Sequence, residues 1–134
     1  IVPSRAALLQ EMRELDGKVL DRLDRECVAL AKRIARRRGI RVAIERISRN
    51  EPARMAPEVQ RAIEAAAAEL RLQTLRMPSG AGHDAQNLAT VTRAGMIFIP
   101  SKGGKSHRPD EASDWRAIER GANVLLHTLL KLAG

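Results

Sequence analysis

The chain has 134 residues, of which 44% are hydrophobic and 1% aromatic, and its formal net charge is +8 at pH 7. A chain of this length suits one domain, and with Phe98 and Trp115 as its only aromatic residues it has no row of rings on which single-stranded nucleic acid could stack. No apolar run approaches the roughly 18 residues of a membrane span, so no membrane partner is expected. The single Cys27 cannot form an internal disulfide, which favours a reducing, cytoplasmic location.

The first third of the chain predicts a strand, a helix and a second strand. Residues 6–13 fit a strand, although their Ala-Ala-Leu-Leu stretch is equally helical by propensity. Residues 18–38 carry apolar side chains at helical spacing, with Asp16 as a candidate N-cap and Gly39 as the residue that ends the helix. A short period-2 pattern over residues 42–47 predicts the next strand. These elements bury too little surface to be stable alone, so a partner surface is expected.

The densest positive charge lies at the end of that helix. Residues 32–38 read Lys-Arg-Ile-Ala-Arg-Arg-Arg, and cations are favoured at a helix C-terminus. The run fits a solvated last turn; the alternative is a phosphate-binding patch, which would make the chain a basic nucleic-acid binder. We expect at most weak, non-specific binding of nucleic acid.

The remaining two-thirds of the chain predicts helices separated by loops. Residues 48–57 contain two prolines and read as a linker, after which Pro57 suits the first turn of a helix. A short helix is expected over residues 84–91, a buried strand over 96–100, and a last helix over 113–131 with a wide apolar face.

Two loops each carry one histidine. One reads Met-Pro-Ser-Gly-Ala-Gly-His-Asp over residues 77–84, and the other reads Gly-Gly-Lys-Ser-His-Arg-Pro-Asp-Glu over 103–111. The apolar segment between them would bring both loops to one sheet edge, where open α/β folds place their chemistry. His107 is the best candidate metal ligand, although a hydrogen-bonded loop histidine would fit the same spacing. A metal site needs several protein ligands, and no complete set is recognisable in this chain.

Three other residues are weighed in the same way. His83 follows Ser79, Gly80, Ala81 and Gly82, whose backbone N–H groups could face an anion; His83 itself could donate to a developing oxyanion, or the stretch could be a plain turn. Arg13 could bind a carboxylate through both arms of its guanidinium, or be one arginine among many. His127, between Leu126 and Thr128, suits a structural role.

Together the motifs resemble a known family. The stretch from Ser79 to Gln86, the run from Met96 to Ser101 and the Gly103–Glu111 motif are similar to the hydantoinase/carbamoylase family of metal-dependent amidases. That family includes N-carbamoyl-L-amino-acid hydrolases, allantoate amidohydrolases and β-ureidopropionases, and is related to aminoacylase-type metallopeptidases. The opening Val2-Pro3, followed by Arg13, and the Gly121–Leu125 stretch extend the resemblance over nearly the whole chain.

The resemblance implies an α/β (α+β) fold, a homodimer and a function. Residues 1–47 would be the second half of a lid or dimerisation domain, 48–57 a linker, and 58–134 the C-terminal part of a catalytic domain. The full-length enzyme would hold two divalent metal ions (Zn, Mn, Ni or Co) and hydrolyse an amide C–N bond in N-carbamoyl-L-amino acids or related ureido acids. His107 would be a metal ligand, and His83 with residues 79–82 would contact the substrate. Arg13 would bind the substrate carboxylate in the opposite subunit.

The sequence also departs from the family. Family members are much longer, and the N-terminal part that carries the other metal ligands and the general base would lie outside this chain. Ser4 stands where Gly is usual, Glu11 where Asp is usual, and Lys105 where an apolar residue is common. We therefore expect the isolated chain to be inactive; the alternative is a non-catalytic dimerisation or binding module derived from the family.

Overall fold

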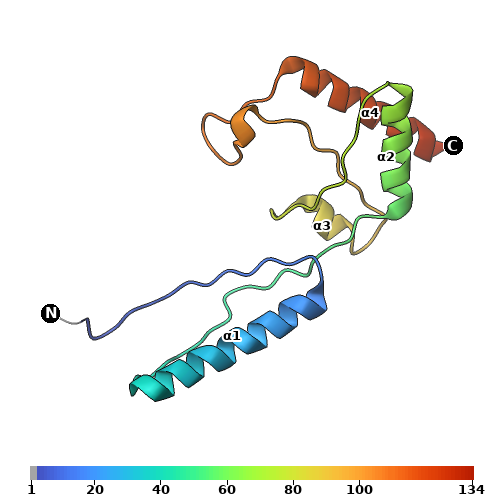
Figure 1. Cartoon of the computed structure of the whole chain (residues 1–134). Coiled ribbons are helices and arrows are strands. Elements are labelled where there is room, and N and C mark those ends of the chain that lie inside the picture. Colours follow the sequence, from blue (N-terminus) through green and yellow to red (C-terminus); the bar gives the residue numbers. More distant parts are fainter. Residues whose placement is uncertain (1–2) are drawn as a thin grey trace. The chain divides into compact units, whose positions relative to one another are not determined.

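The computed structural model describes residues 3–134, which form two compact units, unit 1 (Ile1–Pro52) and unit 2 (Ala53–Gly134). The division falls inside the segment expected to be a linker, and the assignment of the units to a lid and a catalytic domain stays a prediction. Five helical elements follow one another along the described chain (Figure 1). None of these helices is both long enough and apolar enough to cross a membrane.

Unit 1 is built around the helix α1 (Gly17–Arg38). The predicted caps are confirmed: the carboxylate of Asp16 accepts a hydrogen bond from the Lys18 amide at 2.8 Å, and Gly39 ends the helix with φ of 63°. Glycine suits this position because a left-handed backbone conformation is unfavourable for residues with a Cβ. The helix therefore begins and ends where local sequence chemistry places its boundaries.

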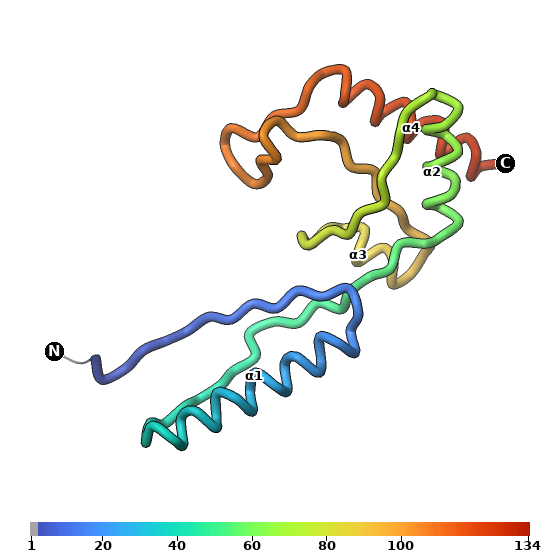
Figure 2. Tube along the Cα trace, viewed as in Figure 1, coloured from blue at the N-terminus to red at the C-terminus, as the bar shows by residue number. Residues whose placement is uncertain are grey.

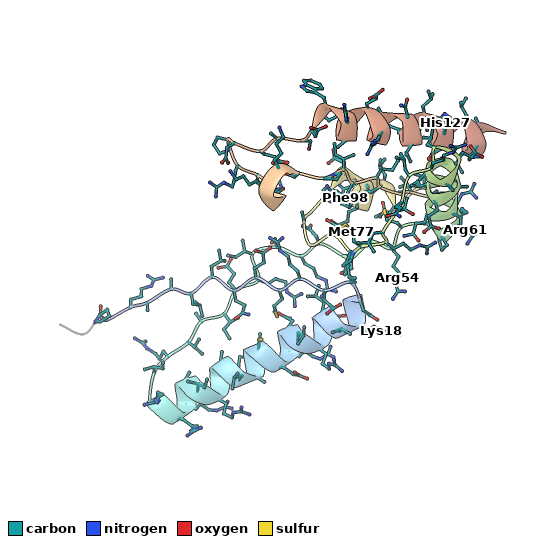
Figure 3. All side chains as sticks on the ribbon, turned by 45° about the horizontal axis from the view of Figure 1, so that its top comes forward. Lys18, Arg54, Arg61, Met77, Phe98 and His127 are labelled. Atoms are coloured by element: carbon teal, nitrogen blue, oxygen red, sulfur yellow. The ribbon has the colours of Figure 1, made fainter. Side chains whose placement is uncertain are left out.

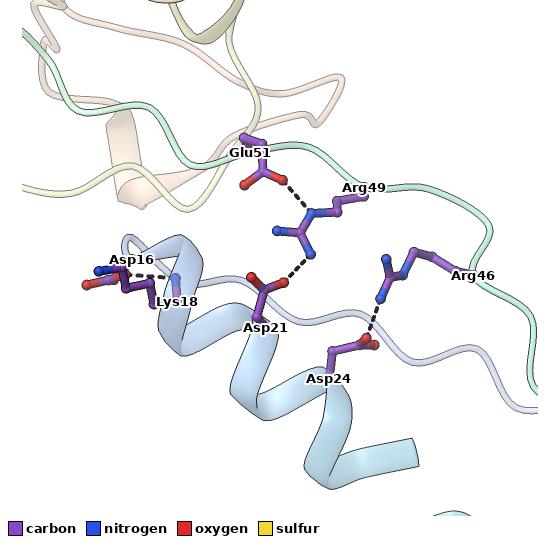
Figure 4. A network of polar contacts seen from close by, with 7 residues as sticks. All are labelled: Asp16, Lys18, Asp21, Asp24, Arg46, Arg49 and Glu51. Atoms are coloured by element: carbon purple, nitrogen blue, oxygen red, sulfur yellow. Dashed lines mark hydrogen bonds and ion pairs between the residues drawn. The ribbon is translucent and has the colours of Figure 1, made fainter. Parts of the chain in front are cut away.

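Extended segments flank α1 on both sides along the chain (Figure 2). The segment after the helix is fixed to it by ion pairs: Arg49 bonds Asp21 and Glu51, and Arg46 bonds Asp24 (Figure 4). The acidic residues of α1 lie in its first half. The basic residues of its second half (Lys32, Arg33, Arg36, Arg37 and Arg38) make no ion pair within residues 3–134.

Strand formation was predicted over residues 6–13, 42–47 and 96–100, and no strand is present in residues 3–134. All three segments are extended, but the described chain contains only one isolated antiparallel bridge, between Ser101 and Ser113. An extended segment becomes a strand only when its N–H and C=O groups pair with a neighbour. Apart from that bridge, no such pairing forms in the described residues, and Leu8 and Leu9 remain 91% and 78% exposed. The strand–helix–strand layout of residues 1–47 is therefore not confirmed.

Unit 2 is organised by the packing of α2 (Pro57–Glu69) against α4 (Trp115–Ala133) (Figure 1). Pro57 occupies the first turn of α2, as predicted, and the side chain of Asp114 caps α4 by accepting from the Arg116 amide at 2.8 Å. The buried core is small: Ala66 and Ala67 of α2 meet Val124 of α4. Several large side chains of α4 stay exposed, namely Trp115, Leu125, Leu126, Leu129, Leu130 and Leu132.

An extended segment over residues 94–100 contacts both helices. Its start is fixed by a 2.8 Å hydrogen bond from the Ala56 amide to the Ala94 carbonyl. A Cβ built on Gly95 would lie 2.5 Å from Val59 of α2, and one built on Gly121 of α4 would lie 2.5 Å from Ile99. These close approaches explain the glycines and hold the segment in place. The prediction that the segment is buried was wrong for Phe98, which is 48% exposed.

Two shorter elements complete unit 2. The helix α3 (Asp84–Leu88) starts directly after His83, and the 3₁₀ turn η1 (Lys102–Gly104) opens the second histidine loop. α3 is shorter than the predicted 84–91, because residues 89–92 continue as turns. Both histidine loops are thus anchored next to helical turns of unit 2.

Candidate functional site

The first histidine loop is closed by hydrogen bonds around the Ser79 hydroxyl. The ring Nε2 of His83 lies 3.0 Å from Ser79 Oγ, and the amide of Ala81 donates to the same oxygen at 3.2 Å. The hydroxyl also lies 3.3 Å from the Ala81 carbonyl. Ser79, Ala81 and His83 are half-buried, so the loop is a compact turn in which the imidazole is held by its own chain.

Phe98 fixes the other side of the His83 ring. The two ring centroids are 5.6 Å apart, and the planes meet at 64°, an edge-on arrangement that aromatic rings favour. Phe98, labelled in Figure 3, belongs to the segment that contacts both α2 and α4. Phe98 therefore links His83 to the segment that contacts both helices. No pattern in the sequence predicts this contact.

The second histidine loop fixes His107 through its backbone. His107 has φ of 56°, and its amide donates to the carboxylate of Glu111 at 2.7 Å. Its side chain is exposed, and the imidazole makes no hydrogen bond within the described part of the chain. Glu111 is the last residue of the second histidine motif, and the motif alone predicts no role for it. In the structure its carboxylate accepts the hydrogen bond from the His107 amide.

Charged side chains close the loop on either side of His107. Lys105 bonds Asp110, and Arg108 Nε donates to the same carboxylate at 3.1 Å. The Lys105 ammonium and then the Arg108 guanidinium hold the pKa of Asp110 below its ordinary value. This network was not predicted, because Lys105 stands where the family pattern has an apolar residue.

A metal site would have to draw on ligands outside residues 3–134. Within these residues no group of three or more His, Cys, Asp and Glu side chains could hold a metal ion. Glu111 and Asp110 are engaged within the loop, and the ring of His83 faces Ser79. The chemistry of the available donors therefore fits His107 as one ligand, with an imidazole that no neighbour engages.

Arg13 lies in unit 1 and is bound by a carboxylate of its own segment. Its Nε and Nη2 both lie 2.8 Å from the same oxygen of Glu11. This hydrogen bond and the accompanying charge raise the pKa of Arg13 and lower the pKa of Glu11. The guanidinium thus makes the kind of contact that a substrate carboxylate would need.

His127 connects the two packed helices. Its Nδ1 lies 3.7 Å from a carboxylate oxygen of Glu69 on α2, and Lys131 of α4 bonds the same carboxylate (Figure 3). Lys131 first, and then His127, lower the pKa of Glu69. These contacts give His127 a place in the helix packing, apart from both loops.

Comparison with known proteins identifies the family. The model of the peptidase family M20/M25/M40 matches residues 5–131. An N-carbamoyl-L-amino acid amidohydrolase of Geobacillus stearothermophilus is 35% identical over 99% of this chain, and an allantoate amidohydrolase of Bacillus subtilis (strain 168) is 36% identical over 99%. The chain spans 32% of each of these relatives.

A solved structure agrees with this result. The amidase of the hydantoinase/carbamoylase family from Burkholderia multivorans matches with a TM-score of 0.82 at 36% identity, over 88% of this chain and 29% of that one. The resemblance seen in the histidine motifs is thereby confirmed. The chain belongs to the peptidase family M20/M25/M40, among its relatives of the hydantoinase/carbamoylase type.

Proposed function

We propose that this chain forms part of a metal-dependent amidohydrolase that cleaves a linear amide C–N bond in N-carbamoyl-L-amino acids or related ureido acids. The observation that carries the proposal is the contrast between two imidazoles of unit 2. The imidazole of His83 is held by Ser79 and Phe98, whereas that of His107 makes no hydrogen bond within the described residues. The names of the relatives support the substrate class, since they include an allantoate amidohydrolase and a ureidoglycolate hydrolase of Arabidopsis thaliana.

In this proposal His107 is a metal ligand. Two divalent ions (Zn, Mn, Ni or Co), with most of their ligands outside this chain, would supply a water of lowered pKa as the nucleophile. The contribution of this chain is an exposed imidazole on a backbone fixed by Glu111. Because residues 3–134 hold no group of three possible ligands, activity is expected to require protein outside the chain.

His83 would stabilise the negative charge that develops on the amide oxygen. The Ser79 hydroxyl has one proton, which can go to the Ala81 carbonyl at 3.3 Å or to Nε2 of His83 at 3.0 Å. When it is donated to Nε2, the proton of a neutral imidazole lies on Nδ1. That N–H can then be donated to the substrate oxygen, with the ring plane held by Phe98. Ser79 is in this way a positioning residue for the ring of His83.

Arg13 would bind the carboxylate of the substrate, in the active site of the opposite subunit of a homodimer formed through residues 1–47. Glu11 already occupies the guanidinium fork, so substrate binding would exchange one carboxylate for another. Such an exchange keeps the arginine paired at each stage and favours substrates that carry a carboxylate. A cytoplasmic location, suggested by the lone Cys27, stays a prediction.

A substrate panel tests the proposal. The protein that contains this chain together with the rest of the catalytic domain is stripped of metal and assayed with N-carbamoyl-L-amino acids, allantoate and an uncharged ureido analogue. We expect turnover only after a divalent metal is restored, and only with substrates that have a carboxylate. His127→Ala is the matched control, because it removes an imidazole of the same unit from the helix packing. Absence of turnover across the metal-restored panel would refute the proposal.

A further inference from the structure

The loop over residues 101–113 is tied at its neck. Ser101 and Ser113 form an antiparallel bridge, and the amide of Lys102 donates to the Ala112 carbonyl at 2.8 Å. The chain therefore leaves and returns at one place, and the residues between form a closed loop directly after the segment that carries Phe98. Its position is set by the neck, and its internal conformation by contacts within it.

The loop contains two turns, and His107 lies between them. The first is closed by the Gly104 amide on the Ser101 carbonyl at 3.1 Å, with Gly103 and Gly104 at φ of 67° and 64°. The second is closed by the Glu111 amide on the Arg108 carbonyl at 3.0 Å. His107 lies between these turns with φ of 56°, a conformation that is unfavourable for a residue with a Cβ.

Side chains from both turns offset this cost. The carboxylate of Glu111 accepts the His107 amide at 2.7 Å, which is a charge-assisted hydrogen bond. Asp110, in the second turn, bonds Lys105, which directly follows the first turn. The ion pair thus connects the two turns across His107, and Glu111 fixes the residue between them. Neither interaction engages the imidazole.

We propose that Glu111 is a positioning residue for His107, and that the Lys105–Asp110 pair supports it by holding the two turns together. Both act on the backbone of His107 and so determine where its imidazole is presented. The inference rests on the proposed function, because the imidazole is a ligand only if the protein binds a metal. The left-handed conformation of His107 is independent of that function and can be measured separately.

The first experiment measures the loop itself. Amide hydrogen exchange of His107 is recorded in the metal-free protein for wild type, Glu111→Ala and Glu111→Gln. We expect Glu111→Ala to exchange about fivefold faster, as for loss of one hydrogen bond, and Glu111→Gln to retain most of the protection because its amide oxygen can still accept. Lys105→Met keeps the side-chain length, and we expect an increase of about twofold, as for an exposed ion pair. Glu119→Ala, an exposed acidic residue on α4, is the matched control.

The second experiment measures the metal. Cobalt(II) affinity is titrated for the same variants in the protein that contains this chain together with the rest of the catalytic domain. We expect Glu111→Ala to bind about 10- to 100-fold more weakly, with Glu111→Gln close to wild type. Unchanged exchange in Glu111→Ala overturns the proposal, and so does faster exchange with unchanged cobalt affinity. If wild type binds no metal, the proposed function fails, and the exchange data still decide whether Glu111 fixes the loop.

Discussion

The two histidine loops of unit 2 fix their residues in opposite ways. At His83 the side chain is held, through Ser79 and Phe98, and the hydrogen-bonding capacity of one ring nitrogen is used within the chain. At His107 the backbone is held, through Glu111, and the ring is exposed. A ring fixed in one orientation suits a hydrogen-bond donor whose direction matters, whereas a fixed backbone with an unengaged ring suits a ligand. This difference is the reason for proposing different roles for two residues that look alike in the sequence.

The largest expected effect comes from removing the unengaged ring. His107→Ala should lose metal and activity together in the full-length protein, by more than the roughly 100-fold that loss of an outer-shell partner can cost. The metal-to-protein ratio, measured by elemental analysis after dialysis, and the rate at saturating metal check this. His107→Ala with full metal content and full rate would remove the distinction between the two loops.

The next effect separates rate from metal content. His83→Ala should lower kcat by about 10²–10³ while leaving the metal-to-protein ratio unchanged, because it removes an oxyanion donor and not a ligand. Ser79→Ala should lower kcat by about fivefold, since it loses one hydrogen bond that orients the ring. Steady-state kinetics with metal-loaded protein check both values, with His127→Ala as control. A change below about threefold in His83→Ala would exclude this role.

A third change, Gly121→Ala, should lower the stability of the packing between α4 and the segment that connects the two loops. Gly121→Ala places a Cβ 2.5 Å from Ile99 Cγ2, in the segment between Phe98 and the neck of the second loop. Although alanine is the better helix former, we expect a net loss of about 1–3 kcal/mol in unfolding free energy from overpacking. Urea denaturation checks the loss. Adding Ile99→Val, which leaves the Cγ2 in place, should not restore stability, whereas Ile99→Ala, which removes that methyl group, should relieve the clash.

The smallest expected effect concerns the pKa values of two exposed carboxyl groups that pair with Arg49. Arg49 bonds two carboxylates, as Asp110 bonds two cations, and it lowers the pKa of both Asp21 and Glu51. Because both pKa values are lowered, the pairs stabilise unit 1 above the ordinary carboxyl range. This stabilisation is lost as pH falls through the lowered values. In Arg49→Gln, carboxyl NMR titration should show both pKa values rising toward ordinary values, while that of Glu11, which pairs with Arg13, stays lowered. Unchanged titration of Asp21 would contradict the structure.

The parts of this molecule set by local chemistry could be predicted, and the parts set by pairing between distant segments could not. The start of α1 at Asp16, its end at Gly39 and the placement of Pro57 follow from capping and from fixed backbone angles. The extended segments have the residue types of strands. A strand, however, forms only when two segments pair, and the pattern of one segment does not show its partner. Within the described residues, the extended segments form no such pairing beyond the single bridge between Ser101 and Ser113.

The same reasoning explains what was missed in the loops. The motif spacing identified His83 and His107, and their roles in the site stay predictions. The partners that fix them could not be predicted. Phe98 is far from His83 in the sequence. Glu111 accepts from the backbone amide of His107, whose positive φ cannot be inferred from the residue types. Only a three-dimensional description shows which atom of each histidine is held.

The charge distribution along α1 has a consequence for its behaviour in different salt solutions. Counterions screen attraction and repulsion alike, and at an ionic strength of about 0.1 M screening acts over roughly 10 Å. Added salt therefore weakens the attractions of the first half, where Asp21 and Asp24 bind arginines, and relieves the mutual repulsion of the five cations between Lys32 and Arg38. As the ionic strength rises, the segment after α1 should thus be held less firmly to the first half of the helix, while the mutual repulsion of cations along the second half falls.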